Sequence, residues 1–303
     1  MEYHVTHADR LPLPASYITE PRYLGYKAVD ESQPYAEFFQ ARAQPIQQQA
    51  REALIVGPAA SEYGPRLSEL VDVMERPGYQ PMECGYTVNA DGHIVVSVLT
   101  KMPGVTGEMW DWWFGWHGAQ TARYKLWHPE AHAFSAMAED RSQDRTLTDR
   151  QRYIDNCSYV DEYLGETLTP LTVRFIDPEK VGFAPAKPGE TTIVARGGLS
   201  SSPLSFAWLV HQVRATPDGS EMRSRFVVND FAVLPVPKES VPAGKAQLLT
   251  HPLIRSVANK VLPHIAGEKL DSFGPRMLHH CAQEMNHLST FLPALHERFA
   301  GTP

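Results

Sequence analysis

The spacing of apolar and polar positions changes along the chain, and the changes separate extended segments from helical ones. The run "GYTVNADGHIVVSVLTKMPG" (residues 85–104) places two stretches of β-formers around a turn at residues 89–92. It predicts a hairpin whose second strand is buried on both faces. Further strands are predicted at "PLTVRFID", "TTIVARGG", "SPLSFAWLVHQVRATP" and "SEMRSRFVVNDFAVLP". Together these runs predict an antiparallel sheet.

Helical spacing occurs before and after the predicted strands. Residues 37–54, "EFFQARAQPIQQQAREAL", predict an amphipathic helix interrupted at Pro45, and residues 64–78 predict a shorter one. The segment "TGEMWDWWFGWHG" predicts a short helix. Near the C-terminus, a long helix is expected to begin at Gly274-Pro275 and to kink or end near Pro293. Its apolar stripe consists of Leu278, Cys281, Met285, Leu288, Leu292 and Leu295, at spacings of three and four.

The order of these elements predicts an α+β fold. A curved antiparallel sheet would wrap the long terminal helix and leave a cavity between them. Residues 1–82 are rich in Pro, Tyr and Gln and are expected to form an N-terminal accessory region, with residues 83–303 as the main domain. A chain of 303 residues is long enough to bury a core in this arrangement.

Composition limits the function classes. The chain has 28 Lys and Arg against 35 Asp and Glu, a formal net charge of −7, so a nucleic-acid partner is not expected. No leader-like segment or long apolar run is present, which predicts a cytoplasmic protein without a membrane partner. Cys84, Cys157 and Cys281 are far apart and form no CxxC pair, so any metal would rest on histidine and carboxylate ligands.

The segment "MLHHCAQEMNHL" (residues 277–288) carries candidate ligands on the predicted terminal helix. At about 100° per residue, Glu284 lies roughly 70° and His280 roughly 110° from the centre of the apolar stripe, whereas His279 points to solvent. His280 and Glu284 are one helical turn apart and could hold one ion. An ordinary surface pair at this spacing is the competing interpretation.

The middle of the chain is rich in aromatic residues. Five of the six tryptophans fall between Trp110 and Trp127, and residues 110–132 also contain His117, Tyr124, His128 and His132. Such a cluster is typical either of a core or of the wall of a pocket for an aromatic ligand.

Two further groups of candidates lie near or within predicted strands. Asp161 and Glu162 in "NCSYVDEYLGETLTPL" would be either functional carboxylates or part of a solvated face. His211 in "FAWLVHQV" would be either a functional group or a hydrogen-bonded core residue.

Three of these segments, taken in order, resemble the 2,4-diacetylphloroglucinol hydrolases and the related phloretin hydrolases. They are "WDWWFGWHGAQTARYKLWHPEAH", "YVDEYLG" and "HCAQEM", and the resemblance covers roughly residues 85–300. It implies a helix-grip domain, like that of pollen allergens and START proteins, after an N-terminal accessory region. It also implies one Zn²⁺ held by two histidines and two glutamates, which fall on His132, Glu162, His280 and Glu284.

The resemblance also implies a reaction and roles for further residues. The reaction is hydrolysis of the carbon–carbon bond between a polyphenol ring and an acyl group, with a small aromatic ketone as substrate. Tyr124 would contact the substrate, His211 would be catalytic, and Trp113 and Trp127 would stack on the ring. A homodimer is also expected. Three other readings stay open at this point: a phloretin-type substrate, a zinc hydrolase of esters or amides, and a non-catalytic carrier of hydrophobic ligands.

Overall fold

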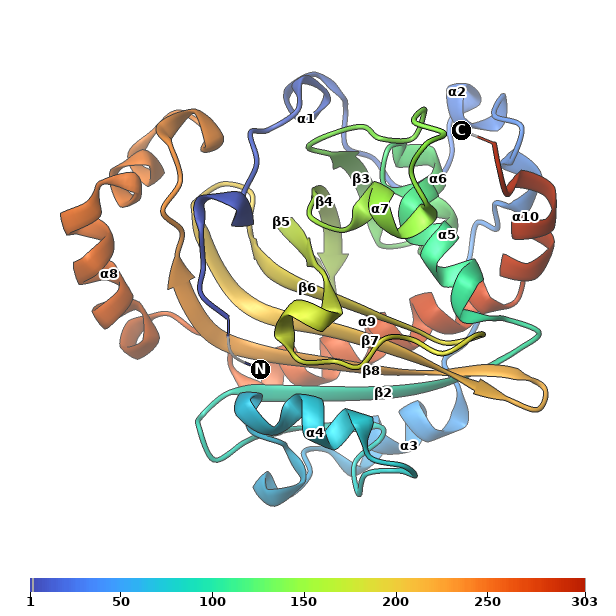
Figure 1. Ribbon diagram of the computed structural model, residues 1–303, viewed down its shortest axis with the longest axis horizontal. Coiled ribbons are helices and arrows are strands. Elements are labelled where there is room, and N and C mark those ends of the chain that lie inside the picture. The colour runs from blue at the N-terminus through green and yellow to red at the C-terminus, as the bar shows by residue number, and fades with distance from the viewer. Residues whose placement is uncertain (2, 303) are drawn as a thin grey trace.

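One antiparallel sheet of eight strands forms the centre of the molecule (Figure 1). The computed structural model describes residues 1 and 3–302. The strands are β1 (Gly85–Val88), β2 (Ile94–Pro103), β3 (His132–Met137), β4 (Cys157–Leu164), β5 (Thr167–Ile176), β6 (Thr191–Leu199), β7 (Leu204–Thr216) and β8 (Gly219–Val233). Their order is β1-β2-β8-β7-β6-β5-β4-β3, so the hairpin predicted at residues 85–104 forms one edge and β3 the other. The predicted antiparallel sheet is confirmed, and β3 and β4 are strands that were not predicted from the sequence.

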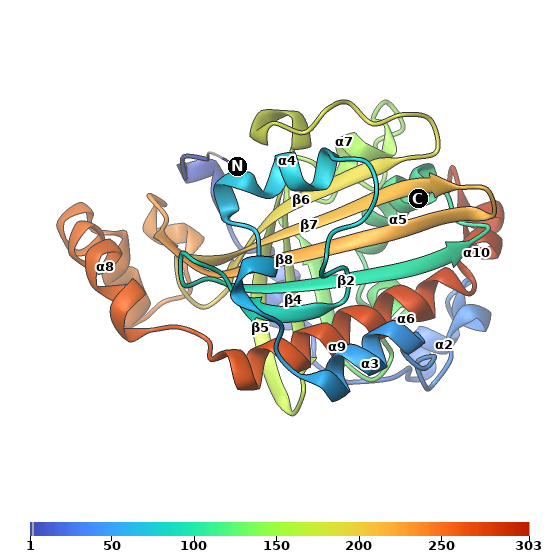
Figure 2. The same ribbon diagram turned by 90° about the horizontal axis from the view of Figure 1, so that it is seen from below.

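Helices surround this sheet (Figures 1 and 2). They are α1 (Ala15–Thr19), α2 (Ala28–Glu31), α3 (Gln48–Val56), α4 (Leu70–Glu75), α5 (Gly107–His117), α6 (Thr121–Trp127), α7 (Asp149–Tyr153), α8 (Pro252–Ile265), α9 (Leu270–Ser289) and α10 (Leu292–Phe299). Figure 2 shows α9 lying along β2 with α3 beside it, and both contacts are present in the structure. No helix in the described part of the chain is long and apolar enough to cross a bilayer.

Both faces of the sheet are buried where β2 lies. Val96 and Val98 belong to the large core that includes α5 and α9, whereas Val95 joins a second cluster with Leu70 and Met74 of α4. Successive side chains of a strand point to opposite faces. A strand covered on both sides therefore carries apolar residues at successive positions, which explains the nearly continuous apolar run that predicted its burial.

The terminal helix begins earlier than predicted. All six residues of the apolar stripe are fully buried, so the stripe is confirmed. However, α9 begins at Leu270 and contains Pro275, so the expected start at Gly274-Pro275 is wrong. A proline removes one backbone hydrogen bond from a helix. Here Phe273 is buried and a Cβ at Gly274 would lie 2.5 Å from the Tyr86 ring, so close packing holds the extra turn in place.

The first predicted helix is also shorter than expected. Within residues 37–54 only α3 is α-helical, and a single 3-10 turn at Ala36–Phe38 precedes it. Pro45 cannot donate a helical hydrogen bond. The N–H of Gln44 instead donates to Nδ1 of His287, 3.2 Å away on α9, so this stretch is bonded to the terminal helix rather than to itself. The helix predicted within residues 64–78 is present as α4.

The N-terminal segment is attached to the sheet by a buried arginine. The Arg10 guanidinium is 2% exposed and donates to the backbone oxygens of Leu199 and Ser202, both at 2.7 Å, and of Ser240 at 2.5 Å. Further along, Nε of Arg22 lies 2.6 Å from a carboxylate oxygen of Asp161 on β4. The expected boundary at residue 82 stays a prediction.

Candidate metal centre

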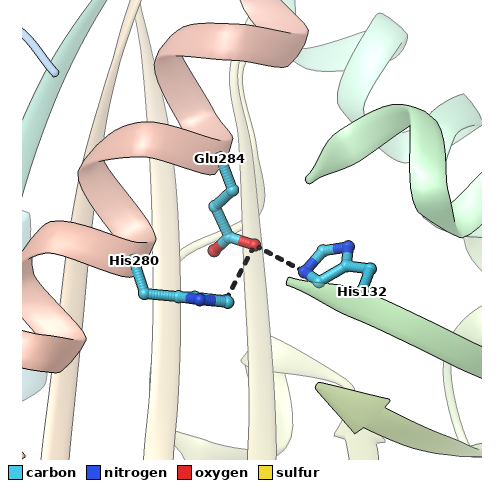
Figure 3. Close-up of side chains that lie close together, drawn as sticks. All are labelled: His132, His280 and Glu284. Carbon is cyan, nitrogen blue, oxygen red and sulfur yellow. Dashed lines mark ion pairs between the residues drawn. The ribbon is translucent and has the colours of Figure 1, made fainter. Parts of the chain in front are cut away.

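Strand pairing and one helical turn bring four candidate ligands together. His132 is the first residue of β3, and Glu162 lies directly opposite it on β4. His280 and Glu284 project from consecutive turns of α9. Figure 3 shows both α9 side chains directed toward His132. One potential ligand atom from each of His132, His280 and Glu284 lies within 4.8 Å of the others, and these three buried residues form a group that could hold a metal ion.

Both glutamates lie close to both histidine rings. The Oε2 atom of Glu284 is 3.4 Å from Nε2 of His132 and 3.6 Å from Nε2 of His280. Glu162 is 3.8 Å from each of the same two nitrogens, through Oε2 to His132 and through Oε1 to His280. Glu162 therefore borders the group of three and is placed to join it.

The remaining hydrogen bonds leave the histidine Nε2 atoms free to act as ligands. Nδ1 of His132 lies 3.0 Å from the carbonyl oxygen of Tyr124, so this nitrogen carries the proton and donates. Nε2 of His132 is buried and has no hydrogen-bond partner. His280 is likewise bonded to the backbone of Tyr163. A second hydrogen bond that fixes the tautomer is typical of metal-binding histidine.

The electrostatics of the group also fit a cation. Burial, and then the charge of Glu162, raise the pKa of Glu284 well above its usual value. Burial lowers the pKa of both His132 and His280, so the imidazoles are neutral. Among the described residues, neither glutamate has a lysine or arginine as an ion-pair partner. Buried carboxylates without a cation are costly, and a divalent ion would supply the missing charge.

This group forms part of the wall of a cavity of about 390 Å³, a size suited to a small ligand. Seven phenylalanine and tryptophan side chains line it: Phe114, Trp127, Phe175, Phe206, Trp208, Phe226 and Phe273. Its polar wall includes His117, Tyr124, Glu162, His211, His280 and Glu284. An apolar cavity with a small number of converging polar groups is typical of sites for aromatic ligands.

Tyr124 connects the cavity to the candidate ligands. Its hydroxyl donates to Oε2 of Glu162 at 2.6 Å, and its ring stacks on His132 with centroids 3.7 Å apart. Burial and the charge of Glu162 raise the pKa of Tyr124 well above its usual value, so the hydroxyl keeps its proton. The tyrosine is therefore a hydrogen-bond donor inside the cavity.

The structure separates the two tryptophans that were expected to stack on a ligand. Trp127 lines the cavity, as predicted. Trp113 is fully buried and stacks on His117 with centroids 4.7 Å apart, behind the residues that line the cavity. Its neighbour Phe114 forms the wall instead, because adjacent residues of a helix face different directions.

His211 lies in the cavity wall and is also hydrogen-bonded in the core. Its Nδ1 is 2.7 Å from Oγ of Ser224, and the side chain is 1% exposed. Burial lowers its pKa from the usual 6.5 to about 3, so the ring is neutral at pH 7. Both readings of His211 thus find support, since a bonded core histidine can still face a cavity.

Sequence reasoning gave no role to His117 or Ser224. His117 lines the cavity, and its Nδ1 lies 2.7 Å from the carbonyl oxygen of Trp113. Its ring is parallel to that of Tyr124, with centroids 5.8 Å apart. His117 and Tyr124 lie on separate helices, α5 and α6, so helical spacing could not relate them.

Three other histidines lie outside the group. His128 stacks on His280 with centroids 5.0 Å apart, and burial lowers its pKa to about 2. His279 is exposed, as predicted from the helical wheel. His287 is buried, and its Nδ1 accepts the Gln44 N–H, which is a structural role.

Known proteins match this chain along most of its length. It is 27% identical to a 2,4-diacetylphloroglucinol hydrolase of Pseudomonas protegens over 303 residues, covering 96% of this chain and 93% of the relative. It is 28% identical to a phloretin hydrolase of Eubacterium ramulus over 254 residues, covering 79% of this chain and 91% of the relative. A solved norcoclaurine synthase from Thalictrum flavum overlaps with a TM-score of 0.27 at 8% identity, too low to inform the fold.

A family model gives the broadest classification. The model described as the DAPG hydrolase PhiG domain matches residues 65–297. The match spans the sheet, the helices α5, α6 and α9 that line the cavity, and all four candidate ligands. Since it covers well over half of the sequence, this chain belongs to the DAPG hydrolase family.

Proposed function

We propose that this protein is a zinc-dependent hydrolase that cleaves the carbon–carbon bond between a phloroglucinol-type ring and an acyl group. With 2,4-diacetylphloroglucinol and water as substrates, the products would be monoacetylphloroglucinol and acetate. The observation that carries this proposal is the buried histidine and glutamate group in the wall of an aromatic cavity. Membership of the DAPG hydrolase family and the names of the relatives supply the substrate class.

The chemistry of such a substrate defines what the site must do. An aryl carbanion is a very poor leaving group, so the ring must first be protonated at the carbon that bears the acyl group. The three ring oxygens of a 1,3,5-trihydroxybenzene stabilise the resulting keto tautomer. Water then adds to the ketone carbon, the bond to the ring breaks, and its electron pair returns to the ring system. The hydrogen and hydroxyl of one water molecule appear in the deacylated ring and the carboxylic acid.

The residues that would hold Zn²⁺ are His132, Glu162, His280 and Glu284. Two imidazole nitrogens and two carboxylate oxygens are ligands that zinc accepts, whereas calcium and magnesium prefer oxygen alone. When bound, zinc would supply a Lewis acid that polarises an oxygen and makes water a stronger acid. Neutral imidazoles, free Nε2 atoms and uncompensated carboxylates support this assignment.

Other side chains of the cavity would orient the substrate and move protons. The Tyr124 oxygen, whose proton is donated to Glu162, would accept a hydrogen bond from a ring hydroxyl, and His211 would handle the proton at the ring carbon or at water. Trp127 and Phe114 would stack on the ring and exclude water, as their place in the cavity wall allows. The pKa of His211 is about 3, so its imidazole is neutral at pH 7. The ring would take up a proton only if a bound phenolate stabilised the imidazolium.

The test of the proposed function is incubation of the purified protein with 2,4-diacetylphloroglucinol and, in parallel, with phloretin. Chromatography would measure the products with and without a strong zinc chelator. We expect release of acetate and the monoacetyl ring, lost on chelation and restored by zinc. Turnover of phloretin alone would move the substrate to the phloretin type, which the Eubacterium ramulus relative also makes a candidate. Binding of both compounds without any turnover would contradict an enzyme and support a carrier.

Replacing Tyr124 with phenylalanine should raise KM by about tenfold at saturating zinc and should also weaken zinc binding, because the hydroxyl donates to the proposed ligand Glu162. The change in KM reflects the lost hydrogen bond to the substrate, since such bonds contribute about 1 to 1.5 kcal/mol. Tyr153→Phe is the matched control, because it removes a buried tyrosine hydroxyl that binds Asp111 at 2.7 Å outside the cavity wall. Steady-state kinetics would measure both variants. An unchanged KM and kcat in Tyr124→Phe would exclude a contact between this hydroxyl and the substrate.

For the fold, we propose the helix-grip class, with residues 83–303 as the grip domain and residues 1–82 as the accessory region. Support comes from α9, which packs on β1 and β2 and shares the cavity wall with the sheet. A homodimer stays a prediction, which light scattering of the purified protein would test.

A further inference from the structure

Helix α8 exposes four large aliphatic side chains on one face. Figures 1 and 2 show this helix at one end of the molecule, beyond the sheet. Leu253, Ile254, Val257 and Val261 are 73%, 41%, 62% and 43% exposed. The half-buried residues include Arg255, Ala258 and Leu262, and Asn259 accepts the N–H of Val233 at 2.8 Å. A surface helix ordinarily buries its apolar stripe, whereas these four large aliphatic side chains of α8 are exposed.

The segment that contains α8 has basic residues but no acidic ones. Residues 240–267 contain Lys245, Arg255 and Lys260 but no aspartate or glutamate, although acidic residues exceed basic ones in the whole chain. None of these three side chains makes an ion pair with a residue that the structure describes. Leu248, immediately before α8, is 60% exposed and extends the apolar surface. The segment is thus an exposed amphipathic helix with a local excess of three positive charges.

We propose that α8 binds the surface of an anionic lipid membrane. Its 14 residues span about 21 Å. A helix needs roughly 20 residues to cross a bilayer, so α8 is too short to do so. An amphipathic helix with exposed aliphatic residues and basic flanks lies in the plane of the membrane interface instead. The proposal departs from the expectation from composition that there is no membrane partner, because net charge and apolar runs do not report the orientation of one helix.

Charge also decides between a membrane and a second copy of the chain. Lys260 is exposed and flanks the apolar face, so pairing of two α8 helices through these faces would bring the Lys260 side chains of both copies close together. The segment has no carboxylate to compensate them. Anionic headgroups would pair with Lys260 and the exposed Lys245, while the aliphatic residues enter the acyl boundary. The positive segment and its exposed apolar face therefore fit a lipid surface better than another α8.

Membrane binding would also place the cavity near the bilayer. Residues 266–269 connect α8 to α9, and Glu268 in this connection lines the cavity together with Arg276 of α9. Apolar aromatic ketones concentrate in membranes, so the cavity would open where such a ligand is abundant. This consequence rests on the proposed function, whereas membrane binding itself does not.

The experiment is co-sedimentation of the full-length, zinc-loaded protein with vesicles. Vesicles of phosphatidylcholine mixed with phosphatidylglycerol are compared with vesicles of phosphatidylcholine alone. We expect binding to the anionic vesicles only, weakened by salt and reduced by at least about tenfold in the triple variant Leu253→Gln, Val257→Gln, Val261→Gln. The single variant Lys260→Glu should also weaken binding. It changes one exposed side chain, so its effect does not depend on the helix surviving three substitutions.

The matched control is Ile55→Gln with Val56→Gln at the end of α3. These two aliphatic residues are 85% and 81% exposed, but they belong to a different helix. The control should bind vesicles as the unmodified protein does. Binding that is absent from both vesicle types, or that survives the α8 substitutions, would overturn the proposal. So would light scattering that shows a dimer lost in the triple variant without vesicle binding, which would identify a second copy as the partner. Because sedimentation needs no turnover, these results are independent of the proposed reaction.

Discussion

Replacing Glu284 with glutamine is expected to remove bound zinc and to lower kcat/KM by more than about 100-fold. Even groups that only orient a metal ligand are worth about 10–100-fold in affinity or activity, so a ligand should be worth more. Glu284 lies 3.4 and 3.6 Å from the Nε2 atoms of the two histidines. The glutamine keeps the shape of the side chain but removes the negative charge that attracts the ion. Elemental analysis of the purified variant and the hydrolysis assay would measure both effects.

Two further variants make this result specific. His279→Gln changes an exposed histidine of the same helix and should retain both zinc and activity. Glu162→Gln should lose zinc as Glu284→Gln does, because its carboxylate is 3.8 Å from both Nε2 atoms. Full zinc occupancy in Glu284→Gln would refute the proposed ligand set. Full zinc occupancy in Glu162→Gln, with zinc lost in Glu284→Gln, would reduce the proposed ligands to His132, His280 and Glu284.

Replacing His211 with asparagine should lower kcat by about 10²–10⁴-fold while zinc content stays normal. That range is typical for the loss of a general acid or base. Ser224→Ala is the graded comparison, since it removes the 2.7 Å hydrogen bond to Nδ1 but leaves the imidazole in place. We expect a loss of about tenfold in Ser224→Ala, because the ring is then no longer held in one tautomer. Rapid kinetics and elemental analysis would check both variants. A normal kcat in His211→Asn would return this residue to the role of a bonded core histidine.

The pH dependence gives a second measure of the role of His211. Burial lowers its pKa from 6.5 to about 3, so the free enzyme carries a neutral ring at all pH values above about 3. Because kcat/KM reports the free enzyme, we expect no titration of His211 near pH 6.5 in that parameter. A bound phenolate would raise the pKa of the ring, so any titration of His211 should appear in kcat. A step near pH 6.5 in kcat/KM that disappears in His211→Asn would contradict this assignment.

The terminal helix shows how far local pattern leads toward the site. The stripe through Leu278, Cys281, Met285 and Leu288 is buried as predicted, and it alone placed His280 and Glu284 on a flank. A helical wheel gives directions around one axis, but it cannot say what that flank faces. The partner residues His132 and Glu162 lie far away in the sequence, and only the pairing of β3 with β4 places them opposite one another.

The DE pair shows why burial of charge could not be read locally. By its neighbours, "YVDEYLG" was compatible with a solvated face, and β4 was not identified. In the structure Asp161 is 5% exposed and meets Arg22 from the N-terminal segment, whereas Glu162 is 8% exposed and accepts from Tyr124. Each carboxylate is buried because a distant segment supplies its partner, and no local pattern records that partner.

Local sequence by itself determined the hairpin, the long strands and the buried stripe of α9, because alternation and helical period follow from backbone geometry. The family resemblance added the four candidate ligands and the reaction. Only the tertiary structure decided which aromatic side chains line the cavity, placing Phe114 in the wall and Trp113 behind it. It alone also decided that four large aliphatic side chains of α8 are exposed. Both results depend on how each helix is rotated about its own axis relative to its neighbours. The packing of the whole chain fixes that rotation, and no single segment does.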